Sequence, residues 1–121
     1  MIRERQFKRY VLIAFAATKE YIEKHPFEGK TTLQFAIEAK INRKQLQAAF
    51  KKFTGMGLQE YLLAQRMKQA GMFLREGNLP IKEIAITCRY KSQRAFTTAF
   101  KKTYGITPLE YQKQNSSYSP L

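Results

Sequence analysis

The chain has 121 residues, enough for one compact domain or two very small ones. Lys and Arg total 22 against nine acidic residues, all of them Glu, so the net charge is +13. This excess favours a polyanionic partner, most commonly nucleic acid and next a membrane surface. With one Cys, one His and no Asp, the chain cannot form an internal disulfide, a zinc site or a Ser-His-Asp triad. We therefore expect neither an enzyme nor a cofactor.

The first predicted element is an amphipathic helix over residues 4–24, because apolar positions recur at helical spacing from Phe7 to Ile22. Basic residues before its apolar part superficially resemble a secretion signal, but the helical pattern continues past that part. His25-Pro26 ends the helix, since the residue before proline disfavours the α conformation. No apolar run approaches the ~18–20 residues that span a bilayer, so no membrane partner is expected.

A pair of short helices follows, predicted over residues 32–39 and 43–53. Thr31 and Gln34 form the capping-box signature of the first helix. Asn42 can cap the second helix, and Gly55 suits the left-handed position that ends it. The residues expected to be buried in the first helix of this pair are Leu33, Phe35, Ala36 and Ile37.

A longer helix is predicted from Leu58 to Leu74, and Gly77-Asn78 stops it. Three more helices are predicted over residues 81–87, 93–103 and 108–114. Pro80 starts the first of these and Ser92 can cap the second. The third follows Gly105 and begins with Thr107-Pro108, an N-cap followed by proline at the first helical position.

An internal repeat relates the two halves of the chain. Phe50-Lys51-Lys52, Gly55 and Glu60-Tyr61 recur fifty residues later as Phe100-Lys101-Lys102, Gly105 and Glu110-Tyr111. A fixed-offset match of this length indicates a duplicated unit made of helix, turn, helix and supporting helix. The sequence therefore predicts an all-α fold of about seven helices, with two helix-turn-helix subdomains joined by a long linker helix. The expected parts are 1–57, the linker helix 58–76, 77–114 and a flexible tail 115–121.

The repeat also predicts two matching polar helix faces. The sides expected to be buried are Leu46, Ala49, Phe50 and Phe53 in one unit and Phe96, Ala99, Phe100 and Thr103 in the other. No acidic residue occurs from Ala39 to Gln59 or from Ile84 to Leu109. Carboxylates would repel phosphates, so the absence of acidic residues from these two ranges favours a surface that approaches a nucleic-acid backbone.

A basic helix fits the major groove, with its N-terminal half at base edges and flanking cations at phosphates. The expected base contacts are Arg43, Lys44, Gln47 and Ala48 in the first unit and Gln93, Arg94, Thr97 and Thr98 in the second. The expected phosphate contacts are Lys51, Lys52, Lys101 and Lys102. On this pairing Lys44 and Arg94 suit guanine, and Gln47 or Gln93 suits adenine.

The second helix pair resembles the AraC/XylS family of bacterial transcription regulators. The residues that carry the resemblance are Ile81, Ile84-Ala85, Tyr90, Phe96, Phe100-Lys101-Lys102, Gly105, Thr107-Pro108 and Tyr111. The resemblance covers roughly residues 10–113, and Arg66, Ala70 and Leu74 match the family's linker helix. It implies two helix-turn-helix units on a rigid helix, which enter successive major-groove segments of a bent duplex. It also implies RNA polymerase as a partner and a location in the cytoplasm, at the bacterial nucleoid.

The chain departs from the family pattern in its turns and on its outer faces. The family usually has Gly where Arg89 stands, and Lys40 occupies the matching position of the first unit. A non-Gly residue there either strains the turn or tolerates a left-handed conformation at some cost. The family often has Arg where Ala48 and Thr98 lie, which suggests a different target sequence.

We expect a sequence-specific regulator that binds double-stranded DNA, either standing alone or forming the DNA-binding part of a longer protein. This chain holds no small-molecule sensor domain. One alternative is a non-specific architectural protein that coats nucleic acid, with uniform affinity for random DNA. A second is a basic helical module for anionic membrane surfaces.

Overall fold

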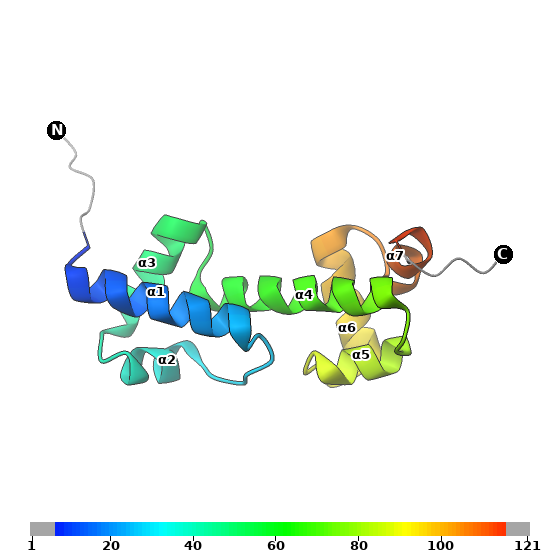
Figure 1. The fold of residues 1–121 in the computed structure, drawn as a ribbon, viewed down its shortest axis with the longest axis horizontal. Coiled ribbons are helices and arrows are strands. Elements are labelled where there is room, and N and C mark those ends of the chain that lie inside the picture. Colours follow the sequence, from blue (N-terminus) through cyan, green and yellow to red (C-terminus); the bar gives the residue numbers. More distant parts are fainter. Residues whose placement is uncertain (1–6, 116–121) are drawn as a thin grey trace. The chain divides into compact units, whose positions relative to one another are not determined.

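The computed structural model describes residues 7–115, and every regular element in that range is an α-helix (Figure 1). The helices are α1 (Arg9–Lys24), α2 (Thr32–Glu38), α3 (Arg43–Thr54), α4 (Leu58–Glu76), α5 (Ile81–Thr87), α6 (Gln93–Tyr104) and α7 (Pro108–Asn115). The predicted all-α class with seven helices is confirmed. The tail predicted for 115–121 lies outside the described residues, apart from Asn115, which ends α7.

The chain forms two compact units, Met1–Leu63 and Ala64–Leu121, and the division falls inside α4. The first unit comprises α1, α2, α3 and the start of α4. The second comprises the rest of α4 together with α5, α6 and α7. The expected duplication is therefore visible as one helix pair with supporting helices in each unit.

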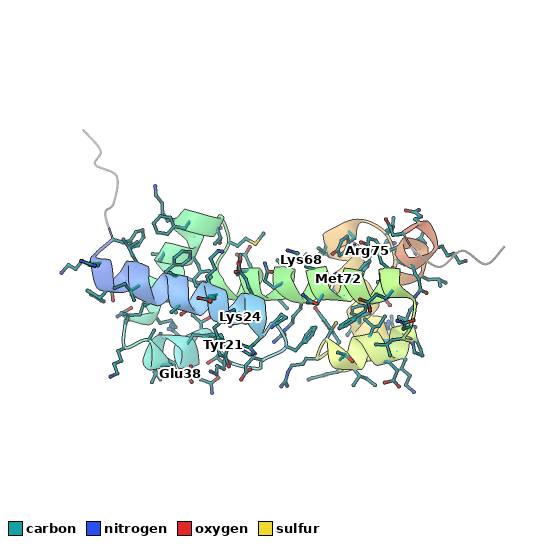
Figure 2. All side chains as sticks on the ribbon, viewed as in Figure 1. Tyr21, Lys24, Glu38, Lys68, Met72 and Arg75 are labelled. Carbon is teal, nitrogen blue, oxygen red and sulfur yellow. The ribbon has the colours of Figure 1, made fainter. Side chains whose placement is uncertain are left out.

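In the first unit, α1 and α2 both pack against α3 (Figure 1). The core residues shared by these helices and the start of α4 are Ile22, Phe35, Ala36, Leu46, Phe50, Leu58 and Leu62. Tyr21 projects from α1 toward α2 (Figure 2), where its ring meets Phe35 edge-on with centroids 6.0 Å apart. Phe15 packs in the same way on Phe50, at 4.8 Å. Aromatic contacts of this kind fix α1 over the helix pair.

In the second unit, the C-terminal part of α4 takes the supporting role. Its residues Met67, Ala70 and Leu74 are buried, as are Ile84 and Ala85 of α5 and Phe96 and Phe100 of α6. The Tyr104 hydroxyl donates to the Met67 carbonyl at 2.9 Å. On α7, the Gln112 amide donates to the Leu74 carbonyl at 3.3 Å. These bonds tie both α6 and α7 to α4.

The helix boundaries follow local signals for most of the chain. Thr31 and Gln34 make the predicted capping box of α2, with bonds of 3.1 and 2.8 Å. α5 spans the predicted residues and begins after Pro80. α1 begins at Arg9 rather than at residue 4, because Lys8 is extended and the Phe7 ring packs on Phe53 at 5.7 Å. Residues 4–6 lie outside the described range.

Four burial predictions are wrong, and each has a packing reason. Leu33 and Ile37 of α2 are exposed, because this seven-residue helix buries one face and Phe35 and Ala36 occupy it. Phe53 lies in the last turn of α3 and stays exposed, although its ring touches Phe7 and Phe15. Thr103 of α6 is exposed, and its hydroxyl donates to the Ala99 carbonyl at 3.2 Å.

Candidate nucleic-acid interface

Each helix pair is held at its turn by the same backbone arrangement. Lys40 and Arg89 both have positive φ, 58° and 66°, at the left-handed position after the first helix. The next residue donates back across the turn: Ile41 to the Ala36 carbonyl at 3.1 Å, and Tyr90 to the Ala85 carbonyl at 3.0 Å. This six-to-one bond is the Schellman closure of a helix C-terminus. It sets the direction in which the second helix of each pair leaves the turn.

The second helix of each pair, α3 or α6, is capped at both ends. The Asn42 carboxamide oxygen accepts from Lys44 N–H at 2.6 Å, and the Ser92 hydroxyl accepts from Ala95 N–H at 3.0 Å. Gly55 and Gly105 end the helices with φ of 78° and 81°. An L side chain is strained in that conformation, so glycine is the natural residue there. The predicted caps and stops of α3 and α6 are therefore confirmed.

The outer face of α3 carries the side chains predicted to contact DNA. Arg43, Lys44 and Gln47 are exposed and Ala48 is half-buried. They line one side of an open groove of about 720 Å³ that also includes Thr32, Lys51, Gly57 and Glu60. Lys52 is exposed beside Lys51 in the last turn. The helix thus brings together the predicted base-contacting and phosphate-contacting residues of the first unit.

Two features of this groove were not predicted from the sequence. The Gln47 carboxamide oxygen accepts from Leu58 N–H at 3.0 Å, so Gln47 is tied to the start of α4. Glu60 places a carboxylate on the groove wall, where it accepts from Gly57 N–H at 3.4 Å. The sequence repeat could have indicated the role of Glu60, because Glu110 is its counterpart in the second unit. Glu110 accepts from Thr107 N–H in the first turn of α7, as Glu60 does from Gly57 N–H before α4.

The outer face of α6 carries the predicted contacts of the second unit. Gln93, Arg94 and Thr98 are exposed and Thr97 is half-buried. The Thr98 hydroxyl donates to the Arg94 carbonyl at 3.0 Å, which fixes the side chain on the helix. Lys101 and Lys102 are exposed in the last turn, at the positions that Lys51 and Lys52 hold in α3. The two faces therefore correspond in the structure as they do in the sequence.

Neither α3 nor α6 contains an acidic residue, although Glu60 of α4 places one carboxylate on the groove beside α3. Within residues 7–115 no group of His, Cys, Asp or Glu side chains is arranged to hold a metal ion. None of the described helices is long and apolar enough to cross a membrane.

A protein-family model described as a helix-turn-helix domain matches residues 35–114. A Streptomyces antibioticus protein named as an AraC-like transcription regulator is 34% identical over 98 residues. That match covers 81% of this chain and 32% of the relative. The chain thus spans about a third of the length of this curated relative.

Two solved structures share the fold. The C-terminal domain of AraT, a response regulator from Geobacillus stearothermophilus, matches with a TM-score of 0.78 and 28% identity, covering 96% of this chain and 95% of that one. The DNA-binding domain of AdpA, a global transcriptional factor solved in complex with a target DNA, matches with a TM-score of 0.76 and 24% identity. That match covers 84% of this chain and 91% of the other.

Proposed function

Because this chain belongs to the AraC/XylS family of DNA-binding transcription regulators, we propose that its two helix-turn-helix units read one double-stranded site. In this proposal α3 and α6 enter successive segments of the major groove, and binding regulates transcription. The family is one of regulators rather than enzymes.

The observation that carries the proposal is the pair of matching helix faces. α3 and α6 each expose polar and basic side chains along one side, lack acidic residues, and carry two adjacent lysines in the last turn. A single basic helix would be an ordinary solvated surface. Its repetition on an equivalent helix, behind an equivalent turn, is what a duplex with a periodic groove requires.

The proposed contacts divide into base-reading and phosphate-binding groups. Arg43, Lys44, Gln47 and Ala48 read bases in the first unit, and Gln93, Arg94, Thr97 and Thr98 read bases in the second. Lys51, Lys52, Lys101 and Lys102 bind phosphates. The first group determines which sequence is bound, while the second sets the register and contributes affinity on any sequence.

Selection from a random double-stranded pool tests the proposal and returns the site. A specific regulator is expected to bind its selected site ~10³-fold or more tightly than random DNA. Uniform affinity across the pool, with a steep salt dependence, would instead support a non-specific architectural protein.

Two single substitutions in α6 test the division of roles. Arg94→Ala is expected to cost ~1–3 kcal/mol on the selected site and to relax the preference at one base pair. Lys101→Ala is the matched control on the same helix, and should weaken binding to selected and random DNA about equally. An equal loss on both DNAs for Arg94→Ala would remove Arg94 from the base-reading group.

For the protein in the cell, we propose a location in the cytoplasm, at the nucleoid, where its DNA target lies. RNA polymerase is the proposed partner through which a DNA-bound regulator acts on transcription. Pull-down of RNA polymerase by the protein on its selected site, and not on random DNA, would support this assignment.

A further inference from the structure

The strained turn of each helix pair carries a long cationic side chain. Within residues 7–115, Lys40 and Arg89 are the only non-glycine residues with positive φ, at 58° and 66°, and both are exposed. Glycine adopts this conformation without strain, and Asn, Asp and His are the other residues enriched in it. Lys and Arg make up 22 of the 121 residues, so composition alone would rarely place a cation at both positions.

The closure of the two turns does not require these side chains. The Schellman bonds run between backbone atoms, from Ile41 N–H to the Ala36 carbonyl and from Tyr90 N–H to the Ala85 carbonyl. A glycine at either left-handed position could form the same bond without strain. Strained residues of this kind persist mainly where they serve a function, so a role for the two cations outside the turn is indicated.

Both cations precede a helix that is proposed to enter the major groove. In a helix-turn-helix unit the first helix crosses the DNA backbone and the second lies in the groove, so the turn passes the edge of the groove. A chain spans at most ~3.6 Å per residue, which keeps the Lys40 Cα within ~11 Å of the Arg43 Cα and the Arg89 Cα within ~14 Å of the Gln93 Cα. The groove is about 12 Å wide, so long side chains in the turn are within reach of the phosphates that border it.

The surroundings of both turns are positively charged. The helices that follow the turns, α3 and α6, contain no acidic residue. Glu38, two residues before Lys40, is already bonded to Lys30 at 3.0 Å. In the second unit, burial lowers the pKa of the Arg66 guanidinium on α4, and the positive charge of Arg89 lowers it further. A phosphate at either turn would therefore be stabilised by these charges.

We propose that Lys40 and Arg89 are further phosphate-binding residues, and that this contact is the reason for a cation at each strained turn. The inference rests on the proposed function and adds one contact in each unit to the lysine pairs of α3 and α6. A phosphate contact carries no sequence information. Both residues should therefore contribute affinity on any duplex without changing the base preference.

Lys40→Gly and Arg89→Gly test the proposal, because glycine removes the cation and suits the left-handed backbone. Each variant is expected to reduce the slope of log affinity against log salt by ~0.9, since one phosphate contact is lost. Affinity should fall by the same factor on the selected site and on random duplex. Circular dichroism should show that both variants remain folded, so that the loss cannot be attributed to unfolding.

Two kinds of control accompany the glycine variants. Lys40→Arg and Arg89→Lys keep the charge in the strained turn, and both should keep the wild-type slope. Lys24→Ala removes one exposed cation from α1, where Lys24 pairs with Glu20 at 2.7 Å. Because α1 packs against the buried side of α3, this variant should also keep the wild-type slope.

The outcomes separate the two levels of the argument. If the wild-type protein selects no site, the proposed function fails and the inference fails with it. If it selects a site but both glycine variants keep the wild-type slope, only the inference is overturned. A reduced slope for one variant alone overturns the assignment of the other residue. The inference is also overturned if Lys24→Ala reduces the slope as much as the glycine variants do, because net charge alone would then explain the effect.

Discussion

Lys40 and Arg89 hold the same left-handed backbone conformation at the same place in their units. For residues with a Cβ this conformation costs roughly 1–2 kcal/mol. Both turns nevertheless close with the Schellman bond, so the rest of each helix pair compensates for the strain. Lys40 and Arg89, which stand where the family usually has glycine, therefore produce turns that are strained but fully formed.

Replacing Lys40 by glycine is expected to stabilise the protein. The substitution removes the strain of the left-handed conformation. The greater conformational entropy of glycine in the unfolded chain offsets part of this stabilisation. The free energy of unfolding should rise by about 0.5–1 kcal/mol. Urea denaturation measures this as a higher midpoint with an unchanged dependence of the unfolding free energy on urea concentration. Lys40→Ala is the control, because it removes the same exposed side chain but keeps the strain. The explanation is wrong if the two variants are equally stable.

Cys88 is the C-cap residue that follows α5, and it is completely buried. Burial raises the pKa of its thiol to about 11, so the thiol stays protonated at neutral pH. Since the thiolate is the reactive form, this side chain has the properties of a small hydrophobic core residue.

A thiol reagent at pH 8 is therefore expected to label Cys88 only when the protein unfolds. With a pKa near 11, about 0.1% of the thiol is ionised at this pH. Colorimetric thiol titration should show slow labelling of the native protein and rapid, stoichiometric labelling in denaturant. Fast labelling of the native protein would show that Cys88 is an accessible thiolate, and a redox role for this residue would then be supported.

At the scale of helices, the boundaries could be predicted because their signals are local. Thr31, Asn42 and Ser92 bond within three residues of themselves, so sequence spacing alone identifies them as caps. The exposure of Leu33 and Phe53 could not be predicted, because it depends on which partner helix covers each face. The Gln47–Leu58 bond was missed for a similar reason, as it joins residues 11 apart on two helices.

Gly71 shows how closely two elements approach in the second unit. A Cβ on this residue of α4 would lie 3.0 Å from the Tyr104 hydroxyl and 3.2 Å from the Tyr111 hydroxyl. Neither hydroxyl can move freely, because Tyr104 donates to the Met67 carbonyl and Tyr111 accepts from Arg75 Nη1 at 2.6 Å. The glycine is thus explained by packing of α6 and α7 against α4.

Gly71→Ala is expected to destabilise the protein, although alanine favours a helix by about 1 kcal/mol over glycine. The added methyl group must displace the anchored hydroxyl of Tyr104. In a Tyr104→Phe background that oxygen is absent, so the same substitution should cost less or become stabilising. Thermal melts of the four proteins in this double-mutant cycle measure the difference. Additive effects would mean that Gly71 and the Tyr104 hydroxyl do not interact.

At the scale of the whole chain, the net charge of +13 favours a polyanion, and the number of phosphates that the cations neutralise determines how binding depends on salt. Each phosphate neutralised by a protein cation releases condensed counterions, so the logarithm of the affinity falls linearly with the logarithm of salt concentration. The lysine pairs at the ends of α3 and α6 are the residues proposed to do this, one pair in each unit. Their separate contributions to the salt slope can therefore report which units touch the duplex.

Lys51→Ala and Lys101→Ala form a matched pair for this measurement, because both residues are exposed and occupy equivalent positions. If both units bind one duplex, each substitution should reduce the slope of log affinity against log salt by ~0.9. The double variant should then reduce it by ~1.8, since distant and independent sites contribute additively. A loss confined to Lys51→Ala would mean that only the first unit contacts DNA, and a loss confined to Lys101→Ala only the second. The additive outcome alone agrees with two helix-turn-helix units on one site.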